Sequence, residues 1–412
     1  MPKRVVPTAA MGALCFEIGI LTVLPSMTGC EVDHHTTPAA PKTSAAHAPR
    51  SRSTRLSRAL LDESLGLGRR FLLSRQTQRG DFRYQVNFLT GEESQDPAQV
   101  RKAGALWGVA MIHQDRPSDQ TRAALLRGFA FYRACSRPAE QGGRLIAYPG
   151  ALRGETGTLA LVSLALIDFL RAESDAECRR QLDDYLRFLL TLRTANGQFH
   201  QDYELDSGFS FSEPMPYFDG ECLLALAKAA RYLQREDLRA PAIESAHAMY
   251  EVYGKTARRT ETDSPLTKGF YQWGSMAFFE LHQSGWSNTE CLAEWTIDLA
   301  HWMIDVHRTE ERTLNTAYAL EGLSCAYELA RQTQQPDTQL KIGGVIERQL
   351  YKLTSWQLSS SIACDYLKQH ASRDTDLAGG IMNARDDPEL RIDVTQHQMH
   401  AVILARRYLW PR

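Results

Sequence analysis

The segment GETGTLALVSLALIDFL, residues 154–170, opens with glycine and polar residues and continues as a run of small and leucine-type side chains. Such a run is typical of a helix whose whole surface is buried. Across the chain Ala, Leu, Arg, Glu and Gln dominate, whereas β-branched runs and alternating apolar patterns are scarce. The sequence therefore predicts an all-α protein with at least one fully interior helix.

Five further segments share this pattern of a polar or glycine-containing start followed by small and aliphatic residues. They are QVRKAGALWGVAMI from Gln99, DGECLLALAKAARYL from Asp219, YQWGSMAFFELHQ from Tyr271, LNTAYALEGLSCAYELA from Leu314 and DVTQHQMHAVILARRYL from Asp393. Frequent Gly, Ala and Ser residues let neighbouring helix backbones approach closely. We therefore predict six inner helices.

More charged, amphipathic segments alternate with these inner helices, as expected for helices that face water on one side. They span residues 54–76, 119–136, 175–194, 236–255, 288–308 and 337–359. Inner-to-outer connections are short, and most outer-to-inner connections are long. LLSRQTQRGDFRYQ (72–85) also aligns without a gap with LLTLRTANGQFHQD (189–202), which matches Gly80 to Gly197. Internal similarity of this kind indicates repeated helical hairpins.

Twelve helices that alternate in this way resemble the (α/α)6 toroid of six-hairpin glycosidases and related sugar epimerases and lyases. The resemblance rests on architecture and on the helix-start patterns, and it covers residues 54–412. It implies a single all-α domain, an (α/α)6 toroid of six inner and six outer helices. It also implies an enzyme that acts on carbohydrate.

The N-terminal segment differs from the rest of the chain. Lys3 and Arg4 precede an apolar stretch over residues 9–24, which is short for a membrane-spanning helix. The following MTGC, ending at Cys30, resembles the lipobox of bacterial lipoprotein precursors. That resemblance implies a signal peptide over residues 1–29 and a lipid on Cys30. An ordinary signal peptide or an uncleaved anchor remains an alternative.

Residues 30–53 are rich in Pro, Ala, Ser and Thr and lack periodic apolar residues, so we expect a flexible tether. A lipid on Cys30 would then hold the toroid near a membrane. The expected location is the bacterial cell envelope, as a membrane-anchored lipoprotein that faces the periplasm or the cell surface.

Composition excludes some other classes of function. The net charge of −2 comes without a basic tract interleaved with aromatic residues, so nucleic acid is not expected as a partner. No G-x-S-x-G, P-loop or dinucleotide fingerprint occurs, and no cofactor is expected. The cysteines of the toroid are expected to be free thiols, although export would permit disulfides; they are Cys135, Cys178, Cys222, Cys291, Cys325 and Cys364.

The N-termini of all inner helices point to one mouth in such a toroid, and the long loops gather over it. RIDVTQHQMH (391–400) would place a stripe of four polar residues on one helix face there. The candidate catalytic residues are Glu221, Asp219, Asp393, Glu155 and His397. The candidate substrate-binding residues are Gln99, Arg101, Tyr148, Tyr217, Trp273, Arg308, Asn315, Gln396 and His400.

Two carboxyl groups on different helices, such as Glu221 with Glu155 or Asp393, could cleave a glycosidic bond. The structural alternative is that Asp219 and Asp393 are helix N-caps. Asp393, His397 and His400 also have D-x3-H-x2-H spacing, but without a clear fourth ligand no metal site is expected.

The sequence thus favours an exported carbohydrate-active enzyme that hydrolyses glycosidic bonds of an envelope or environmental oligo- or polysaccharide. A uronate epimerase or polysaccharide lyase is the enzymatic alternative, with His397 or a tyrosine as base and Arg101 or Arg308 neutralising the acid. A toroid that binds glycan or protein in envelope assembly, without catalysis, is the third.

Overall fold

The computed structural model describes residues 56–370, 372 and 374–411. Residues Thr54–Arg412 form one compact unit. The predicted signal peptide (1–29), the predicted tether (30–53) and the predicted lipidation site Cys30 lie outside the described residues.

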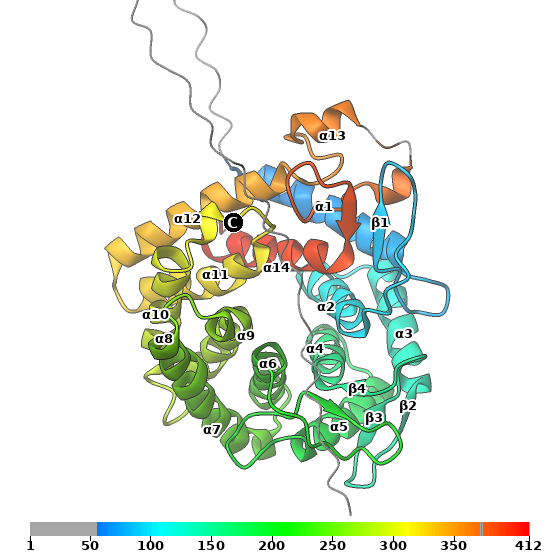
Figure 1. Cartoon of the computed structure of the whole chain (residues 1–412), viewed down its shortest axis with the longest axis vertical. Coiled ribbons are helices and arrows are strands. Elements are labelled where there is room, and N and C mark those ends of the chain that lie inside the picture. Colours follow the sequence, from blue (N-terminus) through cyan, green and yellow to red (C-terminus); the bar gives the residue numbers. More distant parts are fainter. Residues whose placement is uncertain (1–55, 371, 373, 412) are drawn as a thin grey trace, which may run out of the picture. The chain divides into compact units, whose positions relative to one another are not determined.

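An inner ring of six helices surrounds the axis of this unit (Figure 1). These helices are α2 (Gln99–Asp115), α4 (Thr156–Ala172), α6 (Pro216–Tyr232), α9 (Pro265–His282), α11 (Ala317–Gln332) and α14 (Ile392–Tyr408). Each one packs against the next in this order, and α14 packs against α2. The ring is therefore closed, and the prediction of six inner helices is confirmed.

The outer layer follows the predicted alternation. It consists of α1 (Arg58–Arg75), α3 (Asp119–Ala134), α5 (Ala176–Thr191), α7 (Arg239–Met249), α10 (Leu292–Asp305) and α12 (Pro336–Thr354). A π-helical segment, Tyr250–Thr256, extends α7 into the short α8 (Ala257–Thr260). Helices such as α5 bury one apolar face against the ring and expose charged residues on the other. The fold is the predicted all-α (α/α)6 toroid.

Two inner helices begin earlier than predicted from the polar residues at their starts, Asp219 and Tyr271. Helix α6 begins at Pro216 and α9 at Pro265, because proline suits the first helical turn, where its missing N–H leaves no hydrogen bond unmade. Asp219 therefore lies inside the first turn of α6. Arg391 occupies the N-cap position of α14, so Asp393 also lies inside its helix. The N-cap interpretation is wrong for both aspartates.

The internal repeat has a structural counterpart in two equivalent turns. Gly80 and Gly197 have φ angles of 97° and 82°. Residues with a side chain rarely adopt these positive φ angles, whereas glycine does so readily. Each N–H donates to a threonine carbonyl three residues earlier at 3.0 Å. Isolated antiparallel bridges, Gln76–Phe82 and Arg193–Phe199, close the two turns. The aligned segments thus end an outer helix in the same way.

Short antiparallel ladders fix the loops that lead into the inner helices. The pairs are β1 (Gln85–Asn87) with β6 (Glu389–Arg391), β2 (Ser136–Pro138) with β3 (Arg144–Ile146), and β4 (Gly154–Glu155) with β5 (Asp202–Tyr203). Strands β4 and β6 run directly into α4 and α14. The remaining short helices are η1 (Glu236–Leu238), η3 (Thr309–Glu311), α13 (Asp365–Gln369) and η4 (Thr375–Leu377).

The six described cysteines are all free thiols. Within the described part of the chain, no helix has both the length and the apolar character needed to cross a membrane.

Candidate active site

The N-terminal ends of the inner helices and the loops before them enclose a cavity of about 1210 Å³, here called the mouth cavity. All six inner helices contribute residues to its lining. The predicted site residues that line it are Gln99, Arg101, Tyr148, Glu155, Tyr217, Glu221, Trp273, Asn315, Asp393, Gln396 and His397. The parallel arrangement of the inner helices thus brings together most of the predicted residues.

Asp219 does not line this cavity. Its fully buried carboxylate accepts hydrogen bonds from Phe199 N–H at 2.6 Å, from Gln198 Nε2 at 3.0 Å and from the Tyr253 hydroxyl at 2.6 Å. Burial raises its pKa to about 6, against the effect of these donors. Asp219 therefore anchors the turn at Gly197 to α6.

Arg308 and His400 also lie outside the mouth cavity. Arg308 has a left-handed backbone (φ 56°), and its exposed guanidinium pairs with Glu311 at 2.5 Å. Arg312, from the same loop, lines the cavity instead. His400 lies one helical turn deeper than His397 and reaches a second cavity.

Glu221 and Glu155 form a carboxyl pair in the wall of the mouth cavity. Glu221 projects from α6 with 3% exposure, and its Oε2 has no hydrogen-bond partner among the described residues. Burial, and then the charge of Glu155, raises the pKa of Glu221 well above its ordinary value. Gly157 makes room for this carboxyl group, since a Cβ there would lie 2.5 Å from Oε2. The site thus favours the neutral form of the Glu221 carboxyl.

Glu155 has a more polar environment than its neighbour. Burial raises its pKa, and the Gln99 side chain, the Val100 N–H and the charge of Arg101 oppose this rise only in part. Strand pairing of Glu155 with Asp202 fixes its backbone immediately before α4. The two carboxyls therefore differ in character, as a general acid and a base require.

Asp393 is tied to arginines rather than to another acid. Arg391 binds both carboxylate oxygens, at 3.0 and 2.5 Å, and Arg101 lies 3.6 Å away. Both guanidinium groups lie over the ring of Tyr84, at 5.2 Å for Arg101 and 5.6 Å for Arg391. Burial, followed by the charge of Asp393, raises the pKa of Tyr84 to about 12. The arginines thus neutralise the charge of Asp393, which makes this carboxylate a poor candidate for the catalytic acid or base.

Glu321, which the sequence analysis did not select, organises the base of the cavity. It is fully buried on α11, and its Oε1 lies 3.2 Å from Nδ1 of His397 and 3.1 Å from Nδ1 of His400. Gln272 Nε2 donates to Oε2 at 3.0 Å. Burial opposes ionisation, but the two histidines lower the pKa of Glu321. Glu321 could have been recognised from the sequence as a candidate site residue, because it is an acidic residue in the middle of an apolar inner segment.

A layer of aromatic residues separates the mouth cavity from the second cavity. The rings of Trp107 and Trp273 lie 5.5 Å apart, with Trp273 against His397 at 5.8 Å and Trp107 against His400 at 5.0 Å. Trp273 faces the mouth cavity and Trp107 the other side. The tryptophans therefore form the floor of the mouth cavity.

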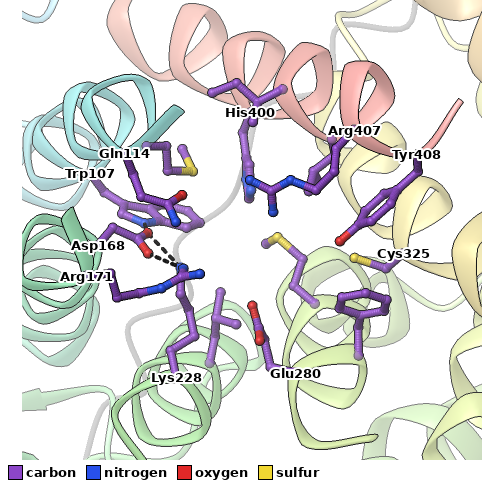
Figure 2. Close-up of a pocket in the computed structure, with 16 residues that line it drawn as sticks. Trp107, Gln114, Asp168, Arg171, Lys228, Glu280, Cys325, His400, Arg407 and Tyr408 are labelled. Carbon is purple, nitrogen blue, oxygen red and sulfur yellow. Dashed lines mark hydrogen bonds and ion pairs between the residues drawn. The ribbon is translucent and has the colours of Figure 1, made fainter. Parts of the chain in front are cut away.

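The second cavity, of about 50 Å³, lies between the C-terminal halves of the inner helices (Figure 2). Lys228 donates to Asp168 at 2.6 Å, Arg171 pairs with the same carboxylate at 2.9 Å, and Trp107 Nε1 donates to it at 2.8 Å. Burial opposes ionisation of Asp168, but Lys228 and Arg171 lower its pKa to about 2. Because Lys228 and Arg171 neutralise its charge, we interpret Asp168 as a structural residue.

No group of three or more His, Cys, Asp or Glu side chains in the described part of the chain is arranged to hold a metal ion. The histidines of the D-x3-H-x2-H segment share Glu321, and its aspartate binds arginines. The arrangement is a hydrogen-bonded network.

No family model matches the sequence, and no curated protein is significantly similar to it. Solved structures do match over most of their length. D-mannose isomerase has a TM-score of 0.61 at 12% identity, covering 88% of this chain and 100% of that chain. A heparin-specific unsaturated glucuronyl hydrolase has a TM-score of 0.60 at 11% identity, covering 85% and 98%.

Cellobiose 2-epimerase from Spirochaeta thermophila matches with a TM-score of 0.56 at 15% identity, covering 84% of this chain and 96% of that chain. The structural matches show a common fold, with which the closed ring of inner helices agrees. Because the identities are this low, they show the fold alone. The chain has the (α/α)6 toroid fold of six-hairpin glycosidases and sugar epimerases.

Proposed function

We propose that this protein is a carbohydrate-active enzyme that hydrolyses glycosidic bonds in the mouth cavity. The observation that carries the proposal is the carboxyl pair. Glu221 is buried, its Oε2 has no hydrogen-bond partner among the described residues, and its raised pKa favours the neutral form. The charge of Glu155, which immediately precedes α4, contributes to this rise. Glycoside hydrolysis requires two carboxyl groups with different protonation states.

Glu221 is the general acid in this proposal, because its raised pKa keeps the proton that the leaving-group oxygen must receive. Glu155 is the carboxylate that activates water or attacks the sugar ring. The Gln99 side chain acts to lower the pKa of Glu155 and so favours its ionised form. Trp273 and Tyr217 line the same cavity and offer aromatic surfaces to the apolar faces of sugar rings.

The comparisons support a carbohydrate as substrate. Among the matching toroids are a glucuronyl hydrolase and an α-mannanase from Bacteroides thetaiotaomicron, the latter with a TM-score of 0.56 at 10% identity, covering 85% of this chain and 95% of that chain. Hydrolysis of an envelope or environmental oligo- or polysaccharide is therefore our leading proposal.

The test is release of reducing ends from a panel of envelope and plant glycans by the full-length protein. Glu221→Gln should lower the rate by about 10²- to 10⁴-fold, the usual range for loss of an acid catalyst. Glu328→Gln is the matched control, because Glu328 is also a buried glutamate of an inner helix but pairs with Arg331 outside the cavity. Equal losses in both variants would contradict the proposal, and glycan binding without turnover would favour a binding toroid.

A second candidate, epimerisation or isomerisation of a sugar, rests on His397. This histidine lines the mouth cavity, is held by Glu321 at 3.2 Å, and could move a proton at the carbon next to a carbonyl. Sugar epimerases and D-mannose isomerase are among the matching toroids. Incorporation of deuterium from heavy water into the sugar, lost in His397→Asn but kept in Glu221→Gln, would favour this candidate over hydrolysis.

We also propose that the protein is exported and anchored in the bacterial envelope by a lipid on Cys30. The support is the lipobox-like MTGC segment and the Pro- and Ala-rich residues after it. Radiolabelled palmitate should be incorporated into the protein in a bacterial host and not into Cys30→Ser. Labelling of both proteins would place the lipid elsewhere.

A further inference from the structure

Lys268 is a cation of the mouth cavity that has no carboxylate partner among the described residues. It lies in the first turn of α9, which contains no acidic residue. The N-terminus of a helix carries partial positive charge, so a lysine there is destabilising. The position is therefore electrostatically unfavourable unless a negative group occupies the cavity.

Two tyrosines hold the ammonium group in place. Nζ of Lys268 donates to the Tyr217 hydroxyl at 2.8 Å and lies 4.7 Å from the centre of the Tyr318 ring. The ring of Tyr217 is 5.2 Å away. An ammonium has three donors, and the described residues accept from one of them. The other two remain available to a ligand.

The neighbouring wall does not compensate the charge of Lys268. Asp263, which lies behind this wall, is bound by two residues of the lining, Arg312 at 2.6 Å and His307 Nδ1 at 2.7 Å. Burial, and after it the charges of Arg312 and Lys268, act to lower the pKa of His307, and hydrogen bonding to Asp263 opposes them only in part. With His307 neutral and Arg312 matched by Asp263, the charge of Lys268 is left over.

The other cations of the cavity differ from Lys268 in this respect. Arg153 pairs with Asp202 at 2.8 Å, Arg391 with Asp393 at 2.5 Å, and Arg101 with Asp96 and Asp393 at 3.6 Å. The mouth cavity is thus polarised, with Glu155 and Glu221 lining one part of it and the uncompensated ammonium of Lys268 in the part formed by α9.

We infer that the mouth cavity binds a saccharide carrying an anionic group, a carboxylate or a sulfate, and that Lys268 pairs with this group. The anion replaces the missing carboxylate partner and uses the free N–H donors. Repulsion from Glu155 keeps the anionic group away from the carboxyl pair and so directs the bond to be cleaved towards Glu221. This inference rests on the proposed function and specifies its class of substrate.

The test is equilibrium binding to the full-length protein by calorimetry, with methyl glucuronide against methyl glucoside, methyl galacturonide against methyl galactoside, and glucose 6-sulfate against glucose. At least one anionic ligand should bind tenfold or more tightly than its neutral partner, and salt should weaken that binding. Preference for a uronide identifies the carboxylate as the anion, and preference for glucose 6-sulfate identifies the sulfate.

Lys268→Gln should remove the preference by weakening the anionic ligand at least tenfold and the neutral ligand less than twofold. Lys268→Arg should restore most of it, because the charge returns. Lys341→Gln is the control, since Lys341 pairs with Asp305 on the outer layer. Equal binding of all partners, no binding of any, or an unchanged preference in Lys268→Gln would each overturn the inference.

Hydrolysis is assayed separately, so the two proposals fail independently. Release of reducing ends from a neutral glycan that depends on Glu221, without anion preference, would remove the inference alone. Anion preference that persists in Glu221→Gln, with no hydrolysis by the native protein, would remove the hydrolase and keep the anion site.

Discussion

Nδ1 of His397 lies 3.2 Å from Oε1 of Glu321, a carboxylate with no exposed surface in the interior of an inner helix. Burial would lower the pKa of His397, but the Glu321 carboxylate overrides it and raises this pKa. The pKa of Glu321 is lowered in return. The contact therefore fixes the imidazole ring at the base of the mouth cavity and favours its charged form.

This pair should stabilise the fold in a defined pH window. The contribution of Glu321 is present above its ordinary pKa of 4.5 and is lost as the pH falls through its lower folded value. That of His397 is present below 6.5 and is lost as the pH rises through its higher folded value. Glu321→Gln should therefore cost most between these values, about 3 kcal/mol in the free energy of unfolding.

Urea unfolding from pH 4 to 9 measures this cost. Glu328→Gln serves as the control, because Glu328 pairs with Arg331, which does not titrate in this range, and its cost should not decline above pH 6.5. A cost for Glu321→Gln that stays constant up to pH 9 would show that His397 is not charged by the contact.

Glu221→Gln should make the protein more stable at pH 7 while it lowers the rate of hydrolysis by about 10²- to 10⁴-fold. The folded-state pKa of Glu221 is raised, so the unfolded chain ionises first and stability falls as the pH rises above 4.5. The amide does not ionise, and the gain should be on the order of 1–3 kcal/mol at pH 7 and absent below pH 4.5. Thermal unfolding at both pH values tests this, and a variant that melts lower at pH 7 would contradict it.

The ring of helices could be predicted because its pattern is local. Small residues and leucine around a whole helix, as in residues 154–170, indicate burial on all sides regardless of neighbours. The start of α6 was misplaced because Asp219 is a strong polar signal, whereas Pro216, which begins the helix, precedes it. The local pattern therefore predicted the number of inner helices more accurately than the residues at which they begin.

The choice between Asp219 and Glu221 depended on orientation about the helix axis. Residues two apart on a helix point about 200° away from each other, so one faces the cavity when the other faces the packed loops. Sequence alone could not say which one. Glu321 was missed for a related reason, because the candidate residues were taken from the helix starts. Its carboxylate lies farther along α11, within reach of His397 and His400.

Asp219→Ala should destabilise the protein without removing catalysis. The change leaves the Phe199 N–H, the Gln198 amide and the Tyr253 hydroxyl without their acceptor, at a cost of about 3 kcal/mol. At a temperature where the variant remains folded, kcat should stay within about threefold of the native value. Circular dichroism and the glycan assay measure the two effects, and a stable but inactive variant would return Asp219 to the active site.

Asp168 and Lys228 should behave as a buried structural ion pair below the tryptophan floor. Asp168→Asn should cost about 3–5 kcal/mol, because Lys228 then stays buried with its charge unmatched. The double variant Asp168→Leu with Lys228→Met should cost much less, since no charge remains. With the pKa of Asp168 lowered to about 2, the stabilisation is present above 3.8 and is lost as the pH falls towards that lower value. A double-mutant cycle in urea at pH 7, with Asp168→Leu and Lys228→Met made singly and together, tests the pair, and additive losses would show that the two groups do not interact.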